Sequence, residues 1–174
     1  AARRGLSNLS STAVALPTYV QSKNIDLVVR HGIFTENEFR ARHAIHLEAY
    51  NKLVNIEAQT MVDMAVHQSL PAAIHYTRSL CDAVNAKMSI GAGCRAEKAL
   101  IQRLSDTTDA LYDAIEALKE ALMGVPKAAA AAACHYHEAV VPAMDVVRKE
   151  ADVLEAMTDK CYWPYPTYSD LLFY

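Results

Sequence analysis

The stretch from Thr35 to Met88 constrains the fold most, because it has the pattern of one long helix, or of two helices joined at Pro71. Thr35 can cap the free amides of a first turn, and Glu38, three residues later, can reach back to the Thr35 amide. Proline removes an amide and clashes with the preceding turn, so we expect a kink at residues 66–70. Apolar or small residues mark one helical face at steps of three and four: Phe39, Leu47, Tyr50, Leu53, Val54, Met61, Met64, Ala65, Ala72 and Tyr76.

This face is wide between Leu53 and Val66, so the helix is expected to have neighbours on more than one side. One charged residue, Glu57, interrupts it. An unpaired carboxylate buried there would cost several kcal/mol in desolvation. We therefore expect Glu57 to be buried with a partner from another helix or to lie at an interface; a catalytic role is the remaining interpretation. The candidate partners are Arg103, Arg148 and His137.

Further helices are predicted on both sides of the long one. Start and stop signals indicate short helices at Thr12–Tyr19 and at Lys23–His31. Leucines at alternating steps of three and four predict a helix from Arg95 to Met123. Gly124 and the proline that follows at residue 126 should join it to a last helix, Lys127–Lys160, as an antiparallel hairpin.

The predicted fold class is therefore all-α. A long central helix, short N-terminal helices and the antiparallel helical hairpin should form an elongated bundle with an extended C-terminal tail. We expect one helical domain over residues 1–174. Within it, residues 1–11 should be a connector, residues 12–160 the helical bundle and residues 161–174 an extended aromatic tail.

The tail should act as a docking segment. Pro164 and Pro166 stiffen it before it binds, and a free aromatic segment would promote aggregation unless something covers it. Either it folds back on its own bundle, or it clasps a neighbouring domain or subunit. The candidate docking residues are Trp163, Tyr165, Tyr168, Leu171, Leu172 and Phe173.

Composition excludes several classes of protein. Hydrophobic residues make up 52% of the chain, but no run of 18 apolar residues occurs, so we expect no membrane span. The formal charge of -3, with both signs interspersed, gives no footprint for nucleic acid. Four dispersed cysteines without a CxxC pair indicate free thiols in a reducing compartment, which we take as the cytoplasm or an organellar matrix. A first residue other than Met favours a fragment, a trimmed chain or a processed organellar protein.

Catalytic, cofactor and metal sites are not predicted in this stretch. No Ser-His-Asp arrangement and no phosphate-cradling loop occurs, and the GxGxxA pattern that starts at Gly91 has no strand before it. Three pairs at a spacing of three residues could each offer two metal ligands, but a metal site needs more. These pairs are His43 with His46, Cys134 with His137, and His135 with Glu138.

Several longer motifs carry a family resemblance over nearly the whole chain. They are Leu16-Pro17, His31-Gly32-Ile33-Phe34-Thr35, the segment from Asn55 to Ala65, and the segment from Trp163 to Phe173. The chain is similar in these motifs to the C-terminal helical region of type III glutamine synthetases (glutamate-ammonia ligases). Ser169 departs from the pattern, since the family usually has Gly there, and the six alanines from Ala128 replace a more charged segment.

The resemblance implies a function for the parent enzyme rather than for this stretch. The family joins ammonia to glutamate with ATP and magnesium or manganese, and it assembles as double-ringed oligomers. Its catalytic residues belong to an upstream domain, so none is carried over to this chain. The resemblance implies a structural and assembly domain whose partners are the upstream catalytic domain or neighbouring subunits. A free-standing helical scaffold subunit descended from this domain is the alternative.

Overall fold

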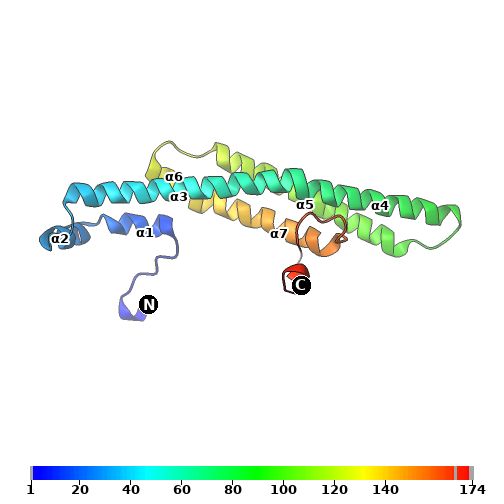
Figure 1. Ribbon diagram of the computed structural model, residues 1–174, viewed down its shortest axis with the longest axis horizontal. Helices are drawn as coiled ribbons and strands as arrows, with labels where there is room; N and C mark the ends of the chain where they lie inside the picture. The colour runs from blue at the N-terminus through cyan, green and yellow to red at the C-terminus, as the bar shows by residue number, and fades with distance from the viewer. Residues whose placement is uncertain (1, 167, 173–174) are drawn as a thin grey trace. The chain divides into compact units, whose positions relative to one another are not determined.

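The computed structural model describes residues 2–166 and 168–172. Within these residues the chain forms helices and turns and no strand, which confirms the all-α class. The predicted long central helix is also confirmed, because a continuous helical stretch of 54 residues runs from Glu36 to Ser89 (Figure 1). No helix in the described part combines the length and the apolar composition that crossing a bilayer requires.

The chain divides into two compact units, and each of the three boundaries between them falls inside a helix. The first unit combines the residues up to Ala58 with Ala121–Pro142, and the second combines Gln59–Glu120 with the described residues from Ala143 onward. The single domain over residues 1–174 stays a prediction. The helical segments of the first unit are η1 (Ala2–Arg4), α1 (Thr12–Tyr19), α2 (Ser22–Arg30), the start of α3 (Glu36–Met64), the end of α5 (Arg95–Met123), α6 (Ala129–His135) and the π-helical turn η3 (Tyr136–Val140).

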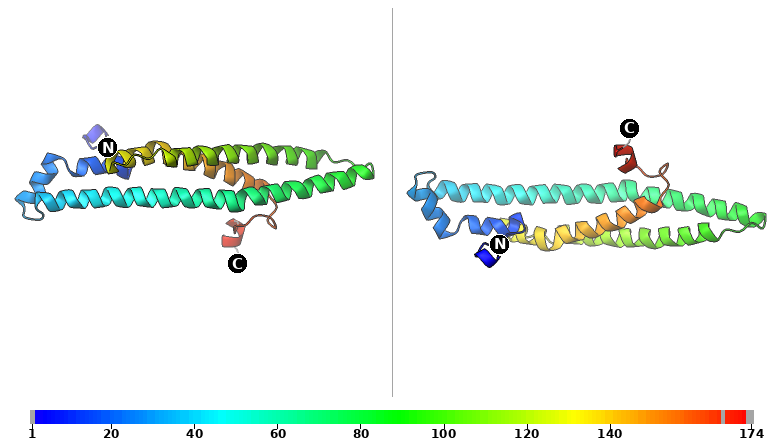
Figure 2. Two further views of the ribbon diagram at one scale, coloured as in Figure 1. Left: turned by 90° about the horizontal axis from the view of Figure 1, so that it is seen from above. Right: turned by 90° about the horizontal axis from the view of Figure 1, so that it is seen from below.

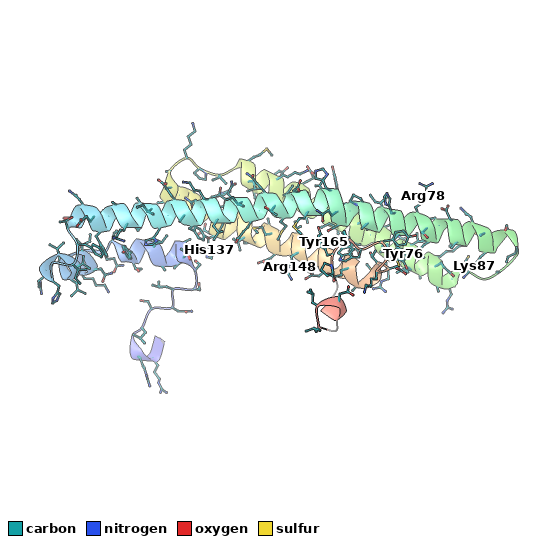
Figure 3. The ribbon with its side chains drawn as sticks, in the orientation of Figure 1. Tyr76, Arg78, Lys87, His137, Arg148 and Tyr165 are labelled. Atoms are coloured by element: carbon teal, nitrogen blue, oxygen red, sulfur yellow. The ribbon has the colours of Figure 1, made fainter. Side chains whose placement is uncertain are left out.

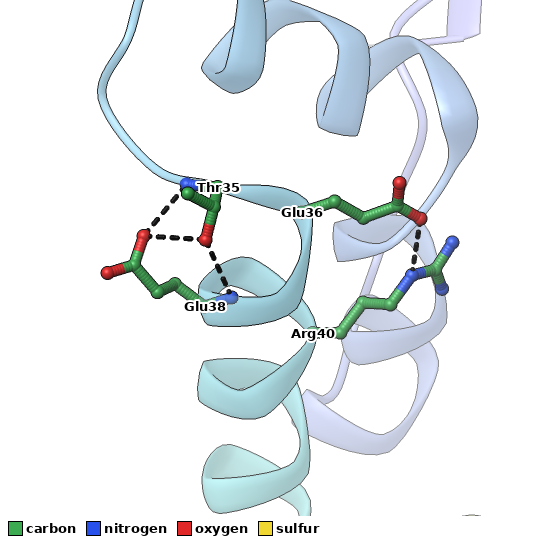
Figure 4. A network of polar contacts seen from close by, with 4 residues as sticks. All are labelled: Thr35, Glu36, Glu38 and Arg40. Carbon is green, nitrogen blue, oxygen red and sulfur yellow. Dashed lines mark hydrogen bonds and ion pairs between the residues drawn. The ribbon is translucent and has the colours of Figure 1, made fainter.

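The start of α3 is fixed by a reciprocal cap, as the sequence predicts. The Thr35 amide and hydroxyl both donate to the Glu38 carboxylate, at 2.8 Å each, and the Glu38 amide donates to the Thr35 hydroxyl at 3.3 Å (Figure 4). These two bonds from Thr35 hold the pKa of Glu38 below its ordinary value. Glu36 and Arg40 add an exposed ion pair one turn later.

Small side chains allow close packing in the core of the first unit. Asn51 on α3 donates its side-chain amide to the backbone carbonyl of Ala129, at 2.9 Å, so α6 and this part of α3 approach closely. The alanine-rich start of α6 makes that approach possible, because no long side chain separates the backbones. The buried cluster is Ala13, Leu16, Leu47 and Ala133, with Tyr50 and Ala129 packed against it.

The second unit is built on α4, α5 and α7. In Figure 2, α4 and α5 lie side by side and run in opposite directions after the turn at Gly91, whose φ of 72° needs glycine. The Lys87 ammonium and the Glu97 carboxylate pair across this turn. The helical segments of the second unit are the end of α3, the π-helical turn η2 (Ala65–Ser69), α4 (Leu70–Ser89), most of α5, most of α7 (Val141–Met157) and the short α8 (Tyr168–Leu172).

The predicted leucine seam of α5 forms the core of this unit. Its side chains at residues 104, 111, 115 and 118 are fully buried, as are two side chains of α7. Helix α5 has the predicted bounds, whereas the last predicted helix starts two residues later and ends three residues earlier. The fully buried large side chains of the second unit are Leu104, Leu111, Ile115, Leu118, Val147 and Leu154.

Two of the prolines inside helices, Pro71 and Pro142, follow a π-helical turn. Pro71 and Pro142 are each the second residue of the helix after η2 or η3. The residue before each proline donates its amide five residues back, Leu70 to Ala65 and Val141 to Tyr136. The predicted disturbance near Pro71 therefore takes the form of a widened turn, which gives the proline ring room against the preceding turn.

Candidate functional site

Glu57 is exposed on α3. The expectation that it is buried within this chain is therefore wrong. The buried residues of this part of α3 are Leu47, Val54 and Ala58. At 3.6 residues per turn, Glu57 lies roughly 80° around the helix from the line that these three define. The sequence analysis placed the buried face of α3 where the large apolar side chains lie, whereas the structure buries small side chains such as Ala58.

The charge of Glu57 acts on the neighbouring Tyr50. Burial of the Tyr50 ring raises the pKa of its hydroxyl, and the negative charge of Glu57 raises it further. Two of the three partners proposed for Glu57 make other contacts: His137 Nε2 lies 3.4 Å from the Ser11 hydroxyl, and Arg148 pairs with Asp152 at 3.5 Å (Figure 3). Contact between Glu57 and another chain stays a prediction.

The first part of the tail docks on its own unit. Trp163 is 8% exposed and meets the ring of Tyr165 edge-on, with 6.0 Å between centroids. Tyr162 packs on Tyr76 of α4 at 5.4 Å. The Tyr165 hydroxyl donates to the Met64 carbonyl at 3.4 Å (Figure 3). For these residues the structure places the tail against its own helices.

The second part of the tail differs from the expected extended course. Tyr168 begins α8, so residues 168–172 are helical. Lys160 pairs with Asp170 and holds this helix to the start of the tail. Leu171 and Leu172 are both exposed, and Phe173 lies outside the described residues. Contact of these two leucines with a neighbouring domain or subunit stays a prediction.

The candidate metal pairs are engaged in other contacts. His43 and His46 both contact the ring of Tyr19. His135 Nε2 lies 2.8 Å from the Ala121 carbonyl, and Cys134 is exposed. Among the described residues, no three His, Cys, Asp or Glu side chains come together as metal ligands. The described residues therefore do not fit a magnesium or manganese site.

Helix α3 carries a row of exposed apolar side chains that was not singled out from the sequence, although neighbours on more than one side were expected and Leu53 was placed on the main face. We call it the outer row: Ile45, Ala49, Leu53 and Ile56. Ile45 is 64%, Leu53 57% and Ile56 61% exposed. The row follows steps of four, four and three, so it occupies one side of the helix, away from the buried face. The signal was present in the sequence as apolar residues on a second face.

An open groove of about 500 Å³ lies on the second unit. Arg103 of α5 lines it together with charged residues of α7, of which Arg148 and Asp152 pair with each other. Both signs of charge are present in this open groove, so it favours no particular class of ligand.

Comparisons with known proteins agree on one family. The model of the glutamine synthetase C-terminal domain family matches residues 1–88. A glutamine synthetase of Butyrivibrio fibrisolvens is 34% identical over 178 residues, which cover 99% of this chain and 25% of that protein. The type-3 glutamine synthetase of Dictyostelium discoideum is 31% identical over 98% of this chain and 24% of its own length. A glutamine synthetase of Bacteroides fragilis (strain YCH46) is 29% identical over 99% of this chain. The chain thus spans about a quarter of the length of these relatives.

Proposed function

Because this chain belongs to the glutamine synthetase C-terminal domain family, we propose that it is the structural and assembly domain of a larger glutamine synthetase. In this proposal the larger protein makes glutamine from glutamate, ammonia and ATP, with magnesium or manganese. The groups that bind these substrates and the metal lie in the part that the relatives have beyond the matched quarter.

The outer row of α3 carries the proposal. Large apolar side chains scattered singly on a surface need no explanation, but a row on one side of one helix is typical of a contact surface. Ile45, Leu53 and Ile56 are each more than half exposed. Burying one such side chain contributes about 1.5–3 kcal/mol, so covering the row would contribute substantially to assembly.

We propose that the outer row packs on the catalytic part of the same enzyme or of a neighbouring subunit. Glu57 lies beside Leu53 and Ile56 on the exposed side of α3, so it would border this contact. A charge at the rim of an apolar contact is typical of protein interfaces, because water still reaches it there. In this proposal Glu57 is a rim residue of the contact that the outer row makes.

The test is made in the full-length protein. Ile45→Lys combined with Ile56→Lys places two charges in the outer row and should lower the native mass, because each charge would be desolvated on assembly. Ile90→Lys is the matched control, since Ile90 is 80% exposed in the loop between α4 and α5. Native mass and glutamine formation are measured for all proteins. An unchanged mass in the double variant would rule out the outer row as an assembly surface.

A further inference from the structure

The register of the long helix changes at η2. There the Leu70 amide donates to the Ala65 carbonyl, five residues earlier, whereas an α-helix uses the carbonyl four residues earlier. A single π-helical turn of this kind is rare and has poorer hydrogen-bond geometry, and such turns are frequent at functional positions. Pro71 lies just after η2 and accounts for the widened turn. It does not account for the contacts that the tail makes beside this turn.

The tail lies against both ends of this turn. The Tyr165 hydroxyl donates to the carbonyl of Met64, the residue just before η2, at 3.4 Å. Ser69, the last residue of η2, is buried, and its side chain acts on the same hydroxyl, where it lowers the pKa of Tyr165 against the effect of burial. A carbonyl oxygen has two lone pairs, so that of Met64 can accept from Tyr165 as well as from its own helix.

The rings beside Tyr165 complete the contact. Trp163 packs edge-on against Tyr165, and Tyr162 packs on Tyr76 of α4. The indole Nε1 of Trp163 is buried without a hydrogen-bond partner among the described residues, so packing holds this ring. Prolines on both sides of Tyr165 fix the backbone and reduce the entropy lost on docking.

We propose that η2 is the docking site for the segment Tyr162–Tyr165 and that the Tyr165 hydroxyl is the latch that holds this segment on the long helix. Releasing the latch frees Trp163 while α4, α5 and α7 keep their structure. The ion pair between Lys160 and Asp170 of α8 joins two residues outside the released segment, so release does not require it to break. The inference rests on contacts inside the second unit and does not depend on the proposed function.

The test uses the indole Nε1–H of Trp163, the one tryptophan of the chain, as a resolved reporter of tail release. Tyr165→Phe removes the hydroxyl and keeps the ring, so the loss of one hydrogen bond should raise the released population, and with it the hydrogen-exchange rate, about fivefold. Ser69→Ala removes the partner on η2 and should raise the rate in the same direction. Tyr112→Phe, at an exposed position on α5, is the matched control and should leave it unchanged.

Helix content is followed by far-UV circular dichroism in the same samples. An unchanged exchange rate in Tyr165→Phe overturns the latch. A faster rate in Tyr165→Phe but not in Ser69→Ala overturns η2 as the docking site. A loss of helical signal in Tyr165→Phe also contradicts the proposal, because the hydroxyl would then support the helices themselves rather than hold the tail.

Discussion

Leu111 offers the clearest test of how the second unit is held together. Its side chain is 0% exposed in the middle of α5, and α5 contributes most of the fully buried side chains of that unit. Leu111→Ala removes three carbon groups, which at about 0.8 kcal/mol each gives about 2.4 kcal/mol of lost transfer free energy. The unfilled cavity adds to this, so the free energy of unfolding should fall by about 3–5 kcal/mol.

The assay is urea unfolding followed by circular dichroism and by the fluorescence of Trp163. Coincident curves for the two probes justify a single free energy of unfolding for the variant and the parent protein. Leu27→Ala is the matched control, because Leu27 is 54% exposed on α2 and should lose less than about 0.5 kcal/mol. A Leu111→Ala cost no larger than that of the control would refute the assignment of this seam as the core.

Three further outcomes follow from local contacts. Thr35→Ala removes the cap of α3 and should lower the free energy of unfolding, measured by urea unfolding, by about 0.5–2 kcal/mol. A change in this free energy smaller than the error of the measurement would mean that the cap is redundant. Glu57→Gln should change the free energy of unfolding by less than about 0.5 kcal/mol, because Glu57 is exposed. It should also lower the pKa of Tyr50, measured by absorbance titration, because the negative charge is removed. A large loss of stability would mean that the carboxylate is buried after all. Burial raises the pKa of Tyr165 from its ordinary value, so the contribution of its hydroxyl to tail docking is complete below about pH 10 and is lost as the pH rises through the folded-state pKa. Trp163 emission that shifts to the red already at about pH 8 would contradict this.

Helix positions were predictable from sequence because they depend on local signals. The Thr35 and Glu38 cap, the leucine seam of α5 and the glycine after α2, Gly32 with a φ of 64°, each act within a few residues, and the structure has all three. The bounds of α1 and α5 agree with the prediction to the residue. Local periodicity therefore specified the elements of this all-α chain.

Packing faces were harder to predict, because they depend on which neighbours approach. Glu57 was assigned to the core since large apolar residues surround it, but alanines such as Ala58 face the neighbour and Glu57 faces water. The tail was read as extended because of its prolines, yet the chain turns at residues 160–162 and residues 168–172 form a helix. Both errors come from tertiary contacts that a single sequence does not encode locally.

The most direct test of the assembly role is reconstitution from two parts. The full-length protein lacking residues 1–174 is prepared, and its native mass and glutamine formation are measured before and after residues 1–174 are added as a separate chain. We predict that residues 1–174 alone form no glutamine, that the remainder alone has a lower native mass than the full-length protein, and that mixing restores both properties. A remainder that already has the full native mass, or ATP-dependent glutamine formation by residues 1–174 alone, would contradict the account.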